Sequence, residues 1–263
     1  KELIKLNNLN LKNITENLID TFLKAGKLAK EISQRGVKIT IKADKSPVTD
    51  GDLAVDELLH NKIKKLTPNI PIISEETVNF DIKKDNKTFW LIDPIDGTRD
   101  YIKKKEEYTL NAALIMNLKP AIGIVYAPAK NRLFFSYGKD FAFEINNEKK
   151  IVLNCKKKNK NEIIGLENSG TTPIEVLDIY KKYKVSKTIK MSSSLKFCIL
   201  ASGEADIYAA KARAFEWDIA AGHIVLEHAG GSVTTHDEKK FLYGKEGYKN
   251  LPIIAKRAQN LEE

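Results

Sequence analysis

Two aspartates stand three positions apart in the segment WLIDPIDGTRDY, residues 90–101. Asp93 follows an apolar run that predicts a buried strand, Pro94 fixes φ in the turn after it, and Gly97 precedes a predicted short helical turn. An isolated Asp-Gly pair is typical of a structural turn. Carboxylates as close as Asp93 and Asp96, however, repel each other unless a cation neutralises them. Mg²⁺ prefers oxygen ligands, so the segment predicts a magnesium site, with N–H groups at the helix start available to a phosphate.

A second acidic pair, Glu75-Glu76, follows the apolar run IPIIS at residues 70–74. Such a pair taken alone is more often part of a solvated surface. A strand that ends at this pair would nevertheless bring a third carboxylate to Asp93 and Asp96, which a structural turn does not explain.

Four segments together resemble a known family. SPVTDGD (46–52), ISEE (73–76), WLIDPIDGTRDY (90–101) and EWDIAAGHIVLEHAGG (216–231) are similar to the metal-site signatures of the lithium-sensitive, magnesium-dependent phosphatases related to inositol monophosphatase. They occur in the family's order. The resemblance implies a site for two or three Mg²⁺ ions, with ligands from Glu75, Asp93, Asp96, Asp218 and the main-chain carbonyl of Ile95.

The same resemblance implies roles around the attacking water. Asp52 and Thr98 occupy the positions that orient and deprotonate this water, and a hydroxyl paired with a carboxylate suits that task. Asp50 is a competing base, although the spacing VTDGD favours Asp52. Gly97, Thr98 and Asp218 are also expected to contact the substrate.

Two further segments narrow the resemblance. YTLNAALIMNLKPAIGIVYAPA (108–129) and SSSLKFCILASGEADIY (192–208) are similar to the CysQ-type 3′(2′),5′-bisphosphate nucleotidases. This implies that Ser193, Ser194 and Lys196 contact the substrate near its second phosphate, while an ordinary serine N-cap is the alternative interpretation.

The chain departs from that pattern in one place. The nucleotidases usually carry an arginine shortly after ADxY, whereas this chain reads ADIYAAKARAFEWD and has Ala210 there. Lys211 and Arg213 are the two candidate replacements, and the sequence does not choose between them.

The bulk composition limits the partners. The net charge of +9 comes from 44 basic and 35 acidic residues, but the lysines are spread along the chain without the interleaved aromatics that bind single strands. We therefore expect no nucleic acid polymer as a partner.

No apolar run approaches the ~20 residues of a membrane span. Two cysteines form no disulfide framework, which predicts a cytoplasmic protein, with attachment to the periphery of the inner membrane as an alternative. Both a monomer and a homodimer remain open.

The periodicity predicts an α+β N-terminal half (1–150) and an α/β C-terminal half (151–263) packed as one compact unit. The resemblance implies a layered αβαβα fold of the sugar-phosphatase and inositol monophosphatase type.

Lys119-Pro120 is expected to connect two strands of a meander. The small residues Ala220 to Gly222 are expected to let the backbone approach the site. We expect His223, His228 and Cys198 to have packing roles. The predicted helices are 11–35, 53–66, 173–183, 193–205 and 217–231, and the predicted strands are 70–74, 88–93, 108–116, 121–127, 132–137, 162–166, 205–210 and 232–236.

The expected reaction is attack of water on a phosphorus atom at the metal site, with release of phosphate. The narrower resemblance implies 3′-phosphoadenosine 5′-phosphate as substrate and AMP as product, with a link to sulfur assimilation and inhibition by lithium. Inositol monophosphate and fructose 1,6-bisphosphate are alternative substrates. A basic nucleic-acid-binding module without catalysis is the alternative outside enzymes.

Overall fold

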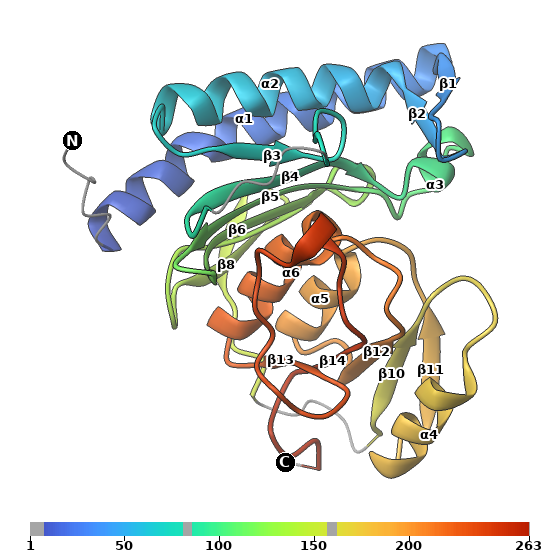
Figure 1. The fold of residues 1–263 in the computed structure, drawn as a ribbon. Helices are drawn as coiled ribbons and strands as arrows, with labels where there is room; N and C mark the ends of the chain where they lie inside the picture. The colour runs from blue at the N-terminus through green and yellow to red at the C-terminus, as the bar shows by residue number, and fades with distance from the viewer. Residues whose placement is uncertain (1–7, 81–85, 157–161, 263) are drawn as a thin grey trace.

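The computed structural model describes residues 8–80, 86–156 and 162–262, which stack in five layers (Figure 1). A helix pair lies on a seven-stranded sheet, a second helix pair lies between that sheet and a five-stranded sheet, and one more helix covers the far side. This order of layers confirms the predicted αβαβα architecture.

The first layer contains α1 (Asn8–Arg35) and α2 (Asp50–Leu66). Leu18 and Phe22 of α1 and Leu59 of α2 are fully buried against the sheet, as their helical spacing predicts. Gly36 ends α1 with a φ of +96°, a left-handed conformation that glycine adopts without strain.

The seven-stranded sheet has the order β3-β4-β5-β6-β7-β8-β9. β3 is parallel to β4, and every later pair is antiparallel, so the predicted meander is confirmed. The strands are β3 (Ile72–Ser74), β4 (Phe89–Asp96), β5 (Thr109–Met116), β6 (Lys119–Ala127), β7 (Arg132–Ser136), β8 (Ala142–Asn146) and β9 (Lys149–Val152).

Two local predictions in this sheet were wrong. The turn between β5 and β6 is formed by Asn117 and Leu118, both at positive φ, as a two-residue hairpin of the favoured twist requires. Lys119 and Pro120 lie within β6, where Pro120 faces a register shift that tolerates its missing N–H. The strand predicted to stop at Asp93 continues through an irregularity to the end of β4.

Shorter elements frame the edge of this sheet. They are the hairpin β1 (Ile39–Ile41) and β2 (Pro47–Thr49), the helix α3 (Thr98–Ile102) and the 3₁₀ turn η1 (Pro128–Lys130). Gly97 precedes α3 at a φ of +90°.

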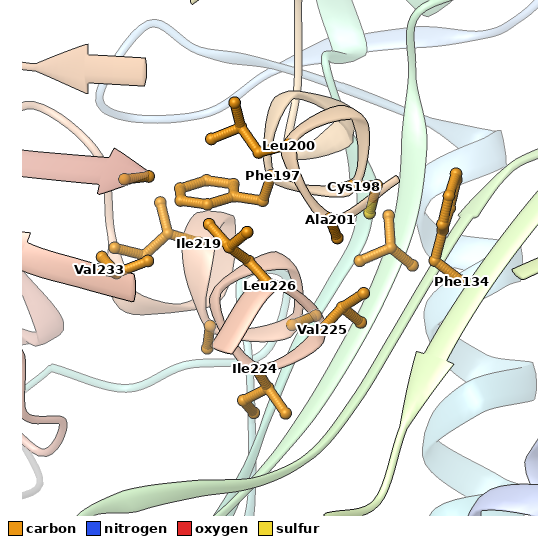
Figure 2. Packing of buried hydrophobic residues seen from close by; sticks show 14 of the residues in the cluster. Phe134, Phe197, Cys198, Leu200, Ala201, Ile219, Ile224, Val225, Leu226 and Val233 are labelled. Atoms are coloured by element: carbon orange, nitrogen blue, oxygen red, sulfur yellow. The ribbon is translucent and has the colours of Figure 1, made fainter. Parts of the chain in front are cut away.

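The central layer contains α5 (Leu195–Ala201) and α6 (Glu216–His228). Figure 2 shows Phe197 of α5 beside Ile219 and Leu226 of α6 in one cluster of buried side chains. A Cβ on Gly222 would lie 2.7 Å from the Cβ of Phe197. Gly222 therefore allows close packing of the two helices, while the expected approach of the backbone at Ala220 to Gly222 to the site stays a prediction.

The five-stranded sheet has the order β11-β10-β12-β14-β13. β10 is parallel to β11 and β12, and the pairs with β14 are antiparallel. Its elements are β10 (Ile164–Glu167), α4 (Ile174–Lys182), β11 (Lys187–Lys190), β12 (Ile207–Ala210), β13 (Ser232–Thr235), the 3₁₀ turn η2 (Glu246–Tyr248) and β14 (Ile253–Lys256). The division of the chain at 150/151 stays a prediction, and β9 lies across that position.

The residues assigned to packing are consistent with that assignment. His223 is buried with Nδ1 2.7 Å from the Tyr243 hydroxyl, and His228 Nδ1 lies 3.0 Å from the Ser136 hydroxyl. Cys155 and Cys198 are buried and unpaired. Among the described residues, no helix has both the length and the apolarity to cross a bilayer.

Candidate active site

Three carboxylates from three elements meet between the first sheet and the central helices. Oxygens of Glu75, Asp93 and Asp218 all lie within 4.8 Å of one another. Glu75 directly follows β3, whose pairing with β4 brings it beside Asp93, and the Glu75 N–H donates to the Ile92 carbonyl at 3.1 Å. Asp218 lies in the first turn of α6, where its carboxylate accepts the Phe215 N–H at 2.8 Å. The third carboxylate predicted from Glu75-Glu76 is therefore beside Asp93.

The cluster carries more negative charge than its surroundings neutralise. Burial, reinforced by Glu75 and Asp96, raises the pKa of Asp93 well above its usual range. Burial and the charge of Asp96 have the same effect on the pKa of Asp218. One oxygen of Asp93, Oδ1, is buried and has no hydrogen-bond partner within the described ranges. A small divalent cation with oxygen ligands would relieve both the repulsion and the unsatisfied oxygen, so these residues fit the implied magnesium.

Asp96 lies at the end of β4 and faces the C-terminal half of the chain. Its Oδ2 accepts the Ser194 N–H at 2.5 Å. Burial raises the pKa of Asp96 to about 6, although Lys196 opposes the shift. Asp96 thus joins the acidic cluster to the start of α5.

The predicted catalytic pair is in contact. The Thr98 hydroxyl lies 3.1 Å from Asp52 Oδ1 and 3.1 Å from the main-chain oxygen of Ile95. Asp52 is buried at the start of α2, and its other oxygen accepts the Thr49 N–H at 2.8 Å and the Thr49 hydroxyl at 2.5 Å. Burial raises the pKa of Asp52. The hydroxyl therefore connects a buried carboxylate with the carbonyl that we expect to bind metal.

Asp50, the competing base, lies apart from this pair. Its carboxylate accepts the Lys38 N–H at 2.9 Å and pairs with Arg35 at 3.0 Å. The hydrogen bonds of the Thr98 hydroxyl within the described ranges go to Asp52 and Ile95 and not to Asp50.

Lys42 is a residue of the site that the sequence did not reveal. Its ammonium lies 3.1 Å from Glu75 and 2.8 Å from Glu76, and it follows β1 directly. Burial raises the pKa of Glu76 to about 7. No sequence signal separates this lysine from the many others in the chain.

A pocket of about 190 Å³ adjoins the cluster on the side of the C-terminal half. The parallel strands β10 and β12 end at this pocket, because Asn168 directly follows β10 and Ala210 is the last residue of β12. Ligand sites in open α/β sheets usually lie at such carboxyl ends of strands. Lining residues include Asp96, Asp218, Asn168, Ser193, Ser194, Lys196, Tyr208, Ala210, Lys211, Arg213 and Asn250.

The serines before α5 do more than cap the helix, although the Ser193 hydroxyl accepts the Leu195 N–H at 3.3 Å. Ser194 is the N-cap of α5, but its side chain makes no capping bond. Its hydroxyl donates to the Asn111 side chain at 2.5 Å and lies 2.8 Å from the Thr109 hydroxyl. Ser193 has a φ of +59°, so the backbone turns sharply before α5. Ser194 thus fixes α5 to β5, beside Asp96.

Lys196 is a buried cation beneath this pocket. Its ammonium donates to the main-chain oxygens of Ser193 at 2.7 Å and Met191 at 3.2 Å, and it lies 5.0 Å from the ring centroid of Tyr208. Burial lowers the pKa of Lys196 to about 8. Tyr208 and Asn168, which the sequence did not single out, meet at 3.2 Å on the same wall.

Residues 10–261 match the profile of the inositol monophosphatase family. The 3′(2′),5′-bisphosphate nucleotidase CysQ of Buchnera aphidicola subsp. Acyrthosiphon pisum is 39% identical over 208 residues, which are 77% of this chain and 76% of the relative. The chain belongs to the CysQ branch of the inositol monophosphatase family. The CysQ nucleotidase of Escherichia coli (strain K12) is 34% identical over 76% of this chain and 79% of its own. The crystal structure of CysQ from Bacteroides thetaiotaomicron, 28% identical, superposes with a TM-score of 0.76 and covers 93% of this chain and 97% of that chain.

Membership in the CysQ branch confirms both resemblances drawn from the sequence. The nucleic-acid-binding alternative finds no support in these relatives.

Proposed function

We propose that this chain is a magnesium-dependent phosphomonoesterase that hydrolyses 3′-phosphoadenosine 5′-phosphate, a 3′(2′),5′-bisphosphate nucleotide, to AMP and phosphate. The observation that carries the proposal is the convergence of Glu75, Asp93 and Asp218 within 4.8 Å beside a pocket that contains buried Lys196. An acidic cluster that meets a cationic pocket suits a substrate with one phosphate at the metals and another farther away.

Glu75, Asp93, Asp96, Asp218 and the Ile95 carbonyl would hold two or three Mg²⁺ ions. Bound magnesium would neutralise phosphoryl charge and make water more acidic. The ends of β3, β4 and α6 hold the oxygens of Glu75, Asp93 and Asp218 within 4.8 Å of one another, so little reorganisation of these carboxylates is needed during the reaction.

Thr98 and Asp52 would orient the attacking water and take up its proton. The water would donate to the Thr98 hydroxyl, whose own hydrogen points to Asp52 Oδ1 at 3.1 Å. Because Thr49 and the start of α2 hold the other oxygen of Asp52, the pair keeps one orientation. A raised pKa makes Asp52 a better proton acceptor than an ordinary aspartate.

The pocket would receive the nucleoside and its second phosphate. Lys196 offers a buried positive charge, and Ser193 and Ser194 shape the turn next to it. Gly97 leaves the approach to the scissile phosphate without a side chain. The two free, buried cysteines support a reducing cytoplasm as the place of action.

Phosphate release with Mg²⁺ would be measured from 3′-phosphoadenosine 5′-phosphate, inositol 1-phosphate and fructose 1,6-bisphosphate, each also with EDTA. We expect the nucleotide to give the highest kcat/KM, with no turnover in EDTA or with Asp96→Asn. A higher kcat/KM for either other substrate would overturn the nucleotide assignment, and turnover that survives EDTA would overturn the metal mechanism.

A further inference from the structure

Three cations line the pocket next to the acidic cluster, and they differ in what already binds them. They are Lys196, Lys211 and Arg213. A bisphosphate nucleotide needs a cation for the phosphate that is not cleaved. The question is which of the three is free to bind it, and it arises only if the proposed nucleotidase function holds.

Lys211 already has an ion-pair partner on α4. Its ammonium pairs with Glu175 in the first turn of α4, 2.9 Å away. Both side chains are about half exposed, so the pair is weak, but it directs Lys211 away from the acidic cluster and toward α4.

Lys196 is already satisfied by protein oxygens. It donates to two main-chain carbonyls and lies against Tyr208, and its carbon chain is buried in α5. It contributes a fixed positive charge under the pocket, with limited freedom to follow a ligand.

Arg213 has no ion-pair partner in the part of the chain that the structure describes. It is exposed and lines the same pocket as Asp96, Asp218 and Lys196, so it shares this pocket with both the acidic cluster and the buried lysine. A planar guanidinium binds phosphate through two parallel N–H donors, which an ammonium does not.

The backbone next to Arg213 is held in place. Asn250 donates its N–H to the Ala214 carbonyl at 3.0 Å and its side-chain amide to the Phe215 carbonyl at 2.5 Å. The Phe215 N–H in turn donates to Asp218. Arg213 therefore stands on a braced segment, three residues past Ala210, that leads directly to a predicted metal ligand.

We propose that Arg213 is the specificity-determining residue for the second phosphate, and that it replaces the arginine absent at Ala210. It binds the non-scissile phosphate through its guanidinium, above the buried charge of Lys196. The hydrogen bonds from Asn250 hold the segment that carries Arg213.

The test compares kcat/KM for 3′-phosphoadenosine 5′-phosphate with kcat/KM for 3′-AMP, which has the same scissile group but lacks the second phosphate. We expect Arg213→Ala to lower the ratio of the two values by about 10- to 100-fold, the size of a lost charge-assisted contact. The ratio for Arg213→Lys should lie between those of the wild type and Arg213→Ala, because lysine keeps the positive charge but lacks the two parallel N–H donors of the guanidinium. Lys211→Ala is the matched control and should keep the wild-type ratio.

A rescue variant makes the test sharper. Ala210→Arg added to Arg213→Ala should restore at least part of the ratio, since position 210 lines the same pocket. An unchanged ratio in Arg213→Ala, or an equal loss on both substrates, would overturn the inference. If the wild type itself shows no preference for the bisphosphate, the proposed nucleotidase function is wrong. This outcome is distinct from an unchanged ratio in Arg213→Ala, which refutes only the role of Arg213. Should Arg213→Ala fail to fold, Arg213→Lys carries the same comparison.

Discussion

The Thr98 hydroxyl lies 3.1 Å from Asp52, a residue 46 positions earlier in the chain and on a different element. The same hydroxyl touches the carbonyl of Ile95, next to two predicted metal ligands. The proposed water-activating pair and the proposed metal site are therefore joined through the Thr98 hydroxyl.

Removal of this hydroxyl should lower turnover without loss of metal. We expect Thr98→Ala and Asp52→Asn each to lower kcat by about 100- to 10,000-fold, because the proton of the attacking water loses its acceptor. Calorimetric titration should show Mg²⁺ affinity close to that of the wild type. Thr98→Ser keeps the hydroxyl and should keep most activity. Asp50→Asn is the control base, and a loss in this variant as large as that in Asp52→Asn would mean that the wrong aspartate has been assigned.

Magnesium should stabilise the fold, and more so at higher pH. The folded-state pKa of Asp96 is about 6, above the value of an exposed aspartate, so protonation stabilises the metal-free fold at low pH. That stability is lost as pH rises through about 6, where Mg²⁺ takes over the neutralising role. Scanning calorimetry should show a larger Mg²⁺-induced rise in Tm at pH 8 than at pH 5.

Substitution of Asp93, a predicted metal ligand, should affect the stability of the metal-free protein and its activity in opposite directions. Asp93→Asn removes a buried negative charge, so we expect its Tm in EDTA to rise by about 2–4 °C, the shift that about 1 kcal/mol gives in a chain of this size. The Mg²⁺-induced rise in Tm and the activity should both disappear. A lower Tm in EDTA would show that Asp93 is a structural residue rather than a ligand.

Deprotonation of Lys196 at alkaline pH should weaken the preference of the enzyme for a substrate with a second phosphate. Burial depresses its folded-state pKa to about 8, so its positive charge is present below that pH and is lost as pH rises through it. The ratio of kcat/KM for the bisphosphate to that for 3′-AMP should therefore fall above about pH 8, since kcat/KM follows the free enzyme. In Lys196→Met the ratio should be low and independent of pH. If the ratio in Lys196→Met fell above the same pH, the pH dependence would belong to a group other than Lys196.

The contact between the central helices predicts a stability effect with no direct role in chemistry. Gly222→Ala places a Cβ 2.7 Å from Phe197, between two packed helices, and should cost about 1–3 kcal/mol as overpacking. Gly170→Ala is the control, because nothing lies within 4 Å of its Cβ. Urea unfolding of both variants measures the difference. Equal stability would show that α5 can move away from α6 at no cost.

The sequence by itself determined the type of chemistry and the type of fold. The carboxylates of Asp93, Asp96 and Glu75 follow apolar segments, and that local order is enough to predict a magnesium site at a sheet edge. The spacing of apolar residues predicted the long helices and strands, because burial of one face of an element leaves a periodic pattern in its own local sequence. The hairpin turn at Asn117 and Leu118 escaped prediction, because Lys119-Pro120 offered a stronger local turn signal than the residues that in fact adopt positive φ.

Tertiary structure alone decided which residues act together. Contact between Thr98 and Asp52, the pairing of Lys42 with Glu75 and Glu76, and the bracing of Phe215 by Asn250 join positions 33 to 46 residues apart, a separation over which sequence spacing carries no distance. The choice between Lys211 and Arg213 was open for the same reason. A cation's availability depends on whether a carboxylate lies near it, and only the packing of α4 against the end of β12 brings Glu175 to Lys211 and leaves Arg213 to the pocket.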